Sequence, residues 1–188
     1  MARILLADDQ RDVLEALRIL LKSEGYQTEG VTSLTGVFHA LEKKEYALLL
    51  MDLNYTGDTT SGREGIDLLE HLQAFDASLP VVVMTGWGSI DLAVEAMRRG
   101  VRDFVQKPWD NAALVTTLRS EIQAGRERRI KTERDLRELE EARRIQRTLL
   151  PAVLPQMDGV ELAASWQPAS GVGGDCFDAI RFSSHRLA

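Results

Sequence analysis

The chain has 188 residues, of which 44% are hydrophobic and 28% charged, a composition typical of a globular protein. It carries 23 basic against 29 acidic residues, and this net charge of −6 excludes a generally basic nucleic-acid binder. No run approaches the roughly 20 apolar residues that a membrane span needs. Because the first residues enter an apolar run at once, without the features of a signal peptide, we expect a soluble, cytoplasmic protein.

Short apolar runs alternate with longer amphipathic stretches along residues 1–123. The runs expected to be strands are 4–7, 27–31, 47–51, 81–85 and 103–105. The stretches expected to be helices are 12–23, 34–44, 64–75, 90–99 and 112–122. This alternation predicts an α/β fold, a doubly wound, five-stranded parallel sheet with right-handed crossovers. All five strands read as apolar enough to be buried on both faces.

Polar side chains follow the expected strands where each one ends. Asp8 and Asp9 follow the first, Asp52 the third, Thr85 the fourth and Lys107 the fifth. In doubly wound sheets, reactive groups gather beyond the carboxyl ends of the strands. Clustered carboxylates repel one another unless a hard divalent cation neutralises them, so we expect a Mg²⁺ site. With the metal present, one carboxylate can attack phosphorus as a nucleophile.

Each of these residues also has a purely structural interpretation. Asp9 would cap the first helix, and Thr85 would be an ordinary β-branched strand residue. Lys107 and Pro108 would form a surface turn, and Phe104 would belong to the core. Four of the five expected strands end in a carboxylate, a hydroxyl or an amine, in the order that one site requires. This coincidence favours the functional interpretation.

Residues 1–123 resemble the receiver domain of two-component response regulators, which has a flavodoxin-like fold. The resemblance implies a phosphoryl group transferred from a sensor histidine kinase. It assigns the residues as follows: Asp8 and Asp9 to the Mg²⁺-binding pair, Asp52 to the phosphoacceptor, Thr85 and Phe104 to the switch pair, Lys107 to phosphate binding, and the Asn54 carbonyl to the metal shell. Gly86 would leave room for the phosphoryl group.

The loop at residues 53–62 departs from that family, because it is longer and lacks the usual Met-Pro pair. Its polar, glycine-containing composition predicts a mobile segment beside Asp52. Tyr55 and Asp58 would either cover the site or play no part in it. The lifetime of the phosphoaspartate is therefore left open.

A helical connector is expected at residues 124–150, continuing the fifth helix without a proline until Pro151. An apolar seam runs along it, made of Leu114, Leu118, Ile122, Ile130, Leu136, Leu139, Ile145, Leu149 and Leu150. A strict heptad from Ile122 places Gly125, Arg129 and Thr132 inward, so the seam is broken at 125–132. We predict a parallel homodimer through residues 110–150, with Gly125 as the helix's weak point and with connector order or dimer geometry carrying the signal. The alternative is a solvated linker.

Residues 142–180 resemble the beginning of the PPM (PP2C-like) serine/threonine phosphatases of the bacterial stress and sporulation type. The resemblance rests on Ile145-Gln146, Leu149-Leu150-Pro151, an expected strand within 159–169, and Gly173-Gly174-Asp175 followed by Phe177 and Asp178. It implies that Asp175 binds paired Mn²⁺ or Mg²⁺ ions, with Asp178 as a further metal-site residue. The alternative is a glycine-rich turn between two strands.

Residues 151–188 are too few for a complete phosphatase, so we expect a truncated, inactive α/β fragment with a disordered tail at 181–188. The intact parent would be a metal-dependent protein phosphatase acting on a phosphorylated regulatory protein. Two alternatives remain: a transcriptional regulator that has lost a DNA-binding or ATPase output domain, and a phosphorylation-controlled dimerisation module without catalytic output.

Overall fold

The computed structural model describes residues 1–53, 63–86, 90–155, 159, 161–168, 171–174, 176–183 and 186–187. Contacts divide the chain into two compact units, Met1–Arg129 and Ile130–Ala188. Among the described residues, no helix has the length and apolar character needed to cross a membrane.

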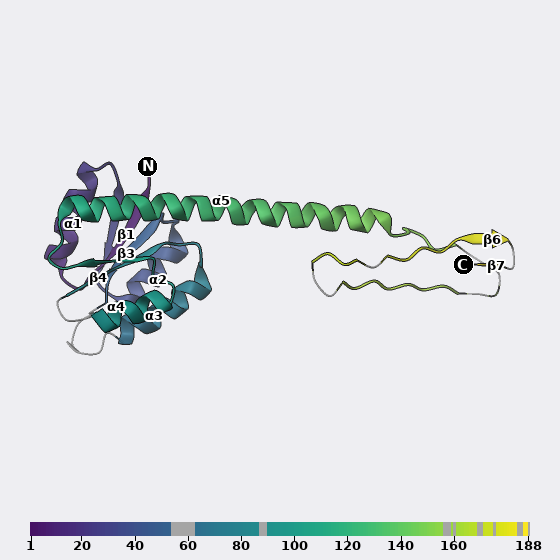
Figure 1. The fold of residues 1–188 in the computed structure, drawn as a ribbon, viewed down its shortest axis with the longest axis horizontal. Coiled ribbons are helices and arrows are strands. Elements are labelled where there is room, and N and C mark those ends of the chain that lie inside the picture. The colour runs from purple at the N-terminus through teal and green to yellow at the C-terminus, as the bar shows by residue number, and fades with distance from the viewer. Residues whose placement is uncertain are drawn as a thin grey trace. The chain divides into compact units, whose positions relative to one another are not determined.

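The first unit is built on a five-stranded parallel sheet (Figure 1). Its strands are β1 (Arg3–Ala7), β2 (Gln27–Val31), β3 (Leu48–Asp52), β4 (Val81–Thr85) and β5 (Asp103–Gln106). They lie in the order β2-β1-β3-β4-β5, so the chain reverses its direction of progress across the sheet beside β1. The predicted doubly wound sheet is confirmed, and each strand lies within one or two residues of its expected position.

Helices cover both faces of this sheet (Figure 1). The helices are α1 (Arg11–Ser23), α2 (Leu34–Lys43), α3 (Arg63–Phe75), α4 (Ile90–Arg98) and α5 (Asn111–Leu149). Side chains alternate along β1: Ile4 and Leu6 pack with α1 and α5, whereas Leu5 and Ala7 pack with α2, α3 and α4. This alternation holds the polar residues after β1 and β3 at one edge of a rigid core.

The two outer strands correct the expectation that every strand is buried on both faces. Only the central strands β3 and β4 are buried at every residue. In β2 no residue is fully buried, and in β5 partly buried and exposed residues alternate. Each of these strands forms one edge of the sheet, where the helical layers leave side chains in contact with water.

Helix α5 runs without interruption from Asn111 to Leu149, as the sequence predicted. Its first turns belong to the core, because Leu114 and Leu118 are 1% and 0% exposed and Ile122 packs against the same cluster. The first three residues of the expected dimer seam therefore pack on the chain's own sheet. The 3.6-residue period that predicts a seam between two copies also describes a helix packed on a sheet.

Gly125 is not the weak point of α5 that the sequence suggested. The helix continues through it, and the residue is buried. A Cβ atom added at Gly125 would lie 2.4 Å from Cγ of Pro80, the residue before β4. The missing side chain is what allows the helix to approach Pro80 closely.

The described part of the second unit has little regular structure beyond the end of α5. Two short strands, β6 (Arg181–Ser183) and β7 (Arg186–Leu187), pair antiparallel, which corrects the expectation of a disordered tail. Residues 161–168 form neither helix nor strand, so the strand expected there is not found. The incomplete α/β phosphatase fragment is thus not shown by the described residues, since a strand needs neighbouring strands to satisfy its backbone groups.

Candidate functional site

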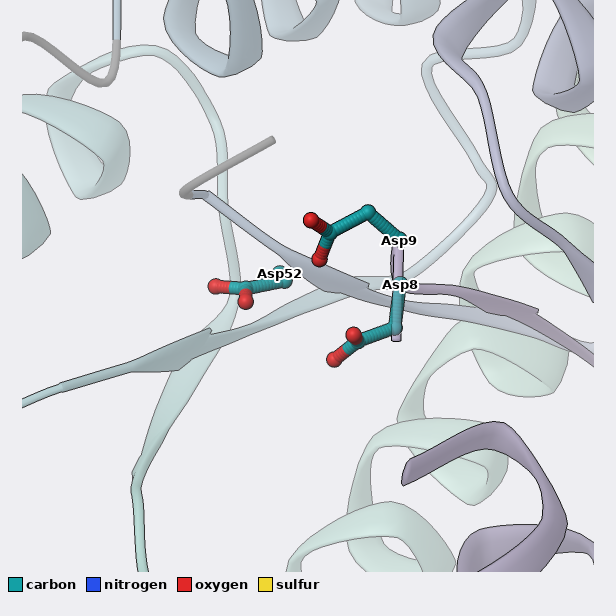
Figure 2. A group of neighbouring side chains, drawn as sticks. All are labelled: Asp8, Asp9 and Asp52. Atoms are coloured by element: carbon teal, nitrogen blue, oxygen red, sulfur yellow. The ribbon is translucent and has the colours of Figure 1, made fainter. Parts of the chain in front are cut away.

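Three carboxylates meet at the carboxyl edge of the sheet (Figure 2). Asp8 and Asp9 follow β1 and Asp52 ends β3, and these strands are neighbours with Ala7 paired to Met51. One ligand oxygen from each carboxylate lies within 4.8 Å of the others. Asp8 is 0% exposed and Asp52 4%. The structure therefore assembles the acidic cluster that the sequence predicted.

Lys107 reaches into this cluster from the end of β5. Its Nζ donates hydrogen bonds to Asp8 Oδ2 and Asp52 Oδ2, both at 2.7 Å. Its backbone N–H donates to the Thr85 carbonyl at 2.7 Å, and the Lys107–Pro108 peptide bond is cis. The surface-turn interpretation of Lys107 is wrong, since the side chain joins two buried carboxylates from different strands.

The charges in the cluster shift one another's protonation. Burial raises the pKa of Asp9 above its ordinary value, and the neighbouring charges of Asp8 and Asp52 raise it further. Burial lowers the pKa of Lys107, but its hydrogen bonds to Asp52 and Asp8 outweigh that effect and the pKa is raised. Lys107 is therefore cationic at neutral pH, and Asp9 gives up its proton at a higher pH than an isolated aspartate does.

The donor set fits a hard divalent cation. Oδ1 of Asp9 is buried and has no hydrogen-bond partner among the described residues. Such an atom is costly to bury unless something binds it. Because carboxylate oxygens are the ligands that Mg²⁺ prefers, Asp8, Asp9 and Asp52 would hold this ion. It would also offset the repulsion that raises the pKa of Asp9.

Asp9 does not cap the first helix, so that alternative is wrong. The residue at the N-cap of α1 is Gln10, which makes no side-chain capping hydrogen bond. The Gln10 backbone N–H instead donates to Asp8 Oδ1 at 2.9 Å. The carboxylate of Asp9 is left for the cluster.

Thr85 and Phe104 occupy different environments on neighbouring strands. Thr85 ends β4 and is 5% exposed, whereas Phe104 in β5 is 46% exposed. The interpretation of Phe104 as a core residue is therefore wrong. A Cβ added at Gly86, next to Thr85, would meet no atom of the described residues within 4 Å. That Thr85 and Phe104 act together as a switch pair stays a prediction.

Several predicted features lie outside the described residues. These are Asn54, the remainder of the loop with Tyr55 and Asp58, and Asp175. Asp178 is described and exposed, and its Oδ1 accepts a hydrogen bond from the Ala179 backbone N–H at 2.8 Å. Its assignment to a phosphatase metal site stays a prediction.

Sequence reasoning missed two ion pairs. It assigned Lys107 to phosphate binding but did not foresee its bond to Asp8. It also missed the pair between Arg129 and Asp76, 53 residues apart. For the second pair the available signal was the Asp-x-Ser sequence at 76–78, a pattern typical of a turn stabilised by the aspartate side chain.

Comparison with known proteins agrees with this geometry. Residues 4–119 match the family model of the response regulator receiver domain. The chain is 36% identical over 115 residues to the "Transcriptional regulatory protein FixJ" of Azorhizobium caulinodans, covering 61% of this chain and 52% of FixJ. The chain thus spans about half the length of that relative.

Solved structures give the same result. A signal receiver domain of a two-component response regulator from Bacteroides fragilis is 32% identical, with a TM-score of 0.59, and 65% of this chain covers 97% of that domain. NtrX from Brucella abortus is 28% identical, with a TM-score of 0.63, covering 71% of this chain and 29% of NtrX. With the family match over more than half its length, the chain belongs to the response regulator receiver domain family.

Proposed function

We propose that Asp52 accepts a phosphoryl group from the phosphohistidine of a sensor histidine kinase. The observation that carries this proposal is the pairing of Lys107 with two buried carboxylates beside the unpartnered oxygen of Asp9. A carboxylate held next to a cation, in a site that fits Mg²⁺, has what phosphoryl transfer requires.

The chemistry is a displacement at phosphorus. A carboxylate oxygen of Asp52 forms the new O–P bond while the P–N bond to the kinase histidine breaks, and the electron pair leaves with the imidazole. Lys107 already touches Asp52 Oδ2, so its ammonium is placed to stabilise charge on the phosphoryl oxygens. Bound Mg²⁺ would neutralise part of the same charge. Asp8 orients Lys107 through the second hydrogen bond.

Thr85 and Phe104 would report the modification. Thr85 ends the strand next to the one carrying Asp52, where its hydroxyl can bond a phosphoryl oxygen. A side chain that is half exposed, as Phe104 is, can turn inward without breaking a packed core. We infer that both respond together to phosphorylation.

Intact mass spectrometry tests the proposal. With acetyl phosphate and Mg²⁺, the chain is expected to gain one phosphoryl group (~80 Da), and Asp52→Asn none. The Asp103→Asn variant, which changes an aspartate outside the cluster, serves as the matched control and should gain the group normally. Equal labelling of the wild type and Asp52→Asn would contradict the proposal.

A second proposal concerns the output that the receiver controls. Gln146, near the end of α5, makes two hydrogen bonds to the backbone of Gly173. Its Oε1 accepts from the Gly173 N–H at 3.0 Å, and its Nε2 donates to the Gly173 carbonyl. The helix end and the glycine pair before Asp175, the two segments on which the phosphatase proposal rests, thus contact each other. The homodimer predicted through residues 110–150 is proposed with it only for the connector beyond Arg129, because the face at 114–125 contacts the chain's own receiver.

A longer protein containing this chain distinguishes the outputs. The phosphatase proposal expects Mn²⁺-dependent hydrolysis of a phosphoserine peptide from a phosphorylated regulatory protein, abolished by Asp175→Asn. Several relatives are named as transcriptional regulators, so promoter binding without phosphatase activity would instead support that alternative.

A further inference from the structure

The middle of α5 contacts the turn between α3 and β4. Arg129 Nη2 donates to Asp76 Oδ2 at 2.7 Å, and Arg129 Nε donates to Ser78 Oγ at 2.9 Å. One helical turn earlier, Gly125 lies against Pro80. We name this contact between Gly125, Arg129 and residues 76–80 the α5 clamp.

The receiver side of the α5 clamp is organised by Asp76 itself. Its Oδ1 accepts hydrogen bonds from the backbone N–H groups of Ser78 at 2.9 Å and Leu79 at 3.2 Å. Burial alone would raise the pKa of Asp76, but the Ser78 hydrogen bonds and the charge of Arg129 lower it below its ordinary value. Asp76 is therefore ionised at neutral pH and presents Oδ2 to Arg129, so the clamp closes through charge-assisted hydrogen bonds.

Two neighbouring groups oppose closure. Nε and Nη2 of Arg128 and Oε2 of Glu121 are buried without a hydrogen-bond partner among the described residues. The shortest approach between these side chains is 3.7 Å, from Nη2 to Oε2, which is too long for a hydrogen bond. Burying such atoms without hydrogen bonds is unfavourable, and moving this stretch of α5 away from residues 76–80 would return them to water.

We propose that the α5 clamp is a releasable contact, closed by the hydrogen bonds of Arg129 and opposed by the buried atoms of Arg128 and Glu121 that make none. Favourable and unfavourable contributions lie close together on the same helix, between residues 121 and 129, so a small perturbation shifts the balance between closed and open forms. Pro80 is part of the clamp and immediately precedes β4. The other end of β4 is Thr85, whose carbonyl accepts the backbone hydrogen bond of Lys107. The clamp thus sits where the receiver can control the start of its connector.

Removing the closing contact and removing the opposing pair give opposite expected results. In Arg129→Met, amide hydrogens of residues 122–129 should exchange about tenfold faster, because the closing hydrogen bonds are lost, corresponding to about 1.4 kcal/mol. When Arg128 and Glu121 are replaced together, as Arg128→Met with Glu121→Leu, the same amides should exchange several-fold more slowly, because no charged atom without a hydrogen bond is then buried. The matched control is Arg134→Met, which breaks only an exposed i,i+4 pair with Glu138.

Hydrogen exchange read by mass spectrometry on the whole unphosphorylated chain separates the outcomes. The proposal is overturned if Arg129→Met exchanges no faster than Arg134→Met, since the contact would then hold nothing. It is also overturned if the double variant Arg128→Met with Glu121→Leu exchanges faster than the wild type, since the Arg128–Glu121 pair would then support closure. None of these readings depends on phosphorylation of Asp52, so failure of the phosphorylation proposal would be seen separately.

Discussion

Replacing Lys107 by methionine is expected to lower the free energy of unfolding by about 3 kcal/mol in metal-free solution at pH 7. The substitution leaves Asp8 and Asp52 buried without their cation, and breaking a buried ion pair costs about 3–5 kcal/mol. The lower end of this range applies because 21% of the Lys107 side chain remains exposed to water. Its raised pKa means that this stabilisation is complete at pH 7 and is lost only as the pH rises through that pKa.

Urea denaturation followed by circular dichroism measures this loss. Lys44→Met is the matched control, because Lys44 also pairs with a carboxylate, Glu29, but at the surface, where a pair is worth about 0–1 kcal/mol. Saturating Mg²⁺ should recover much of the stability of the Lys107 variant, since the ion neutralises the same carboxylates. Equal stability of the two variants would mean that Lys107 does not hold the acidic cluster together.

Replacing Leu118 by alanine is expected to lower the free energy of unfolding by about 3 kcal/mol, independent of protein concentration. Leu118 is 0% exposed and packs between α5 and the sheet, so the substitution leaves a cavity in the receiver core. If this part of α5 were instead a dimer seam, the loss would depend on concentration.

Leu136→Ala provides the control on the same helix. Leu136 is 56% exposed, so the free energy of unfolding should change by no more than about 0.5 kcal/mol. Any effect of this variant should appear in sedimentation equilibrium as weaker self-association. A large, concentration-independent loss in Leu136→Ala would contradict the assignment of residues beyond Arg129 to the connector.

The parallel sheet could be predicted because its signals are local. Each strand is a short apolar run, and the polar residues that follow, Asp8, Asp52 and Thr85, mark where it ends. The exposure of β2 and β5 could not be predicted the same way. It depends on the order of strands in space, which places these two at the edges.

The connector was predicted correctly as a helix but its inner face was assigned to the wrong partner. Leu114, Leu118 and Ile122 repeat as a seam would, and only the structure shows that they face the sheet. Gly125 and Arg129 looked like breaks in a zipper because their partners, Pro80 and Asp76, are distant in the sequence. Periodicity identifies a buried face without identifying what buries it.

The second unit was the least predictable. The expected strand within 159–169 carries the right residue pattern, but a pattern alone does not supply the neighbouring strands that would pair with it. The contact between Gln146 and Gly173 depends on residues 27 positions apart and had no signal in the sequence.

The identity of the phosphorylated residue is the most direct test of phosphoryl transfer to Asp52. After treatment with acetyl phosphate and Mg²⁺, borohydride reduction converts an aspartyl phosphate to homoserine and leaves free carboxylates unchanged, so peptide sequencing by mass spectrometry locates the modified position. If Asp52 is the phosphoacceptor, homoserine appears at position 52 alone, and none appears when Mg²⁺ is removed with EDTA. Homoserine at position 8 or 9, or none at position 52 in a chain that has gained a phosphoryl group, would contradict phosphoryl transfer to Asp52.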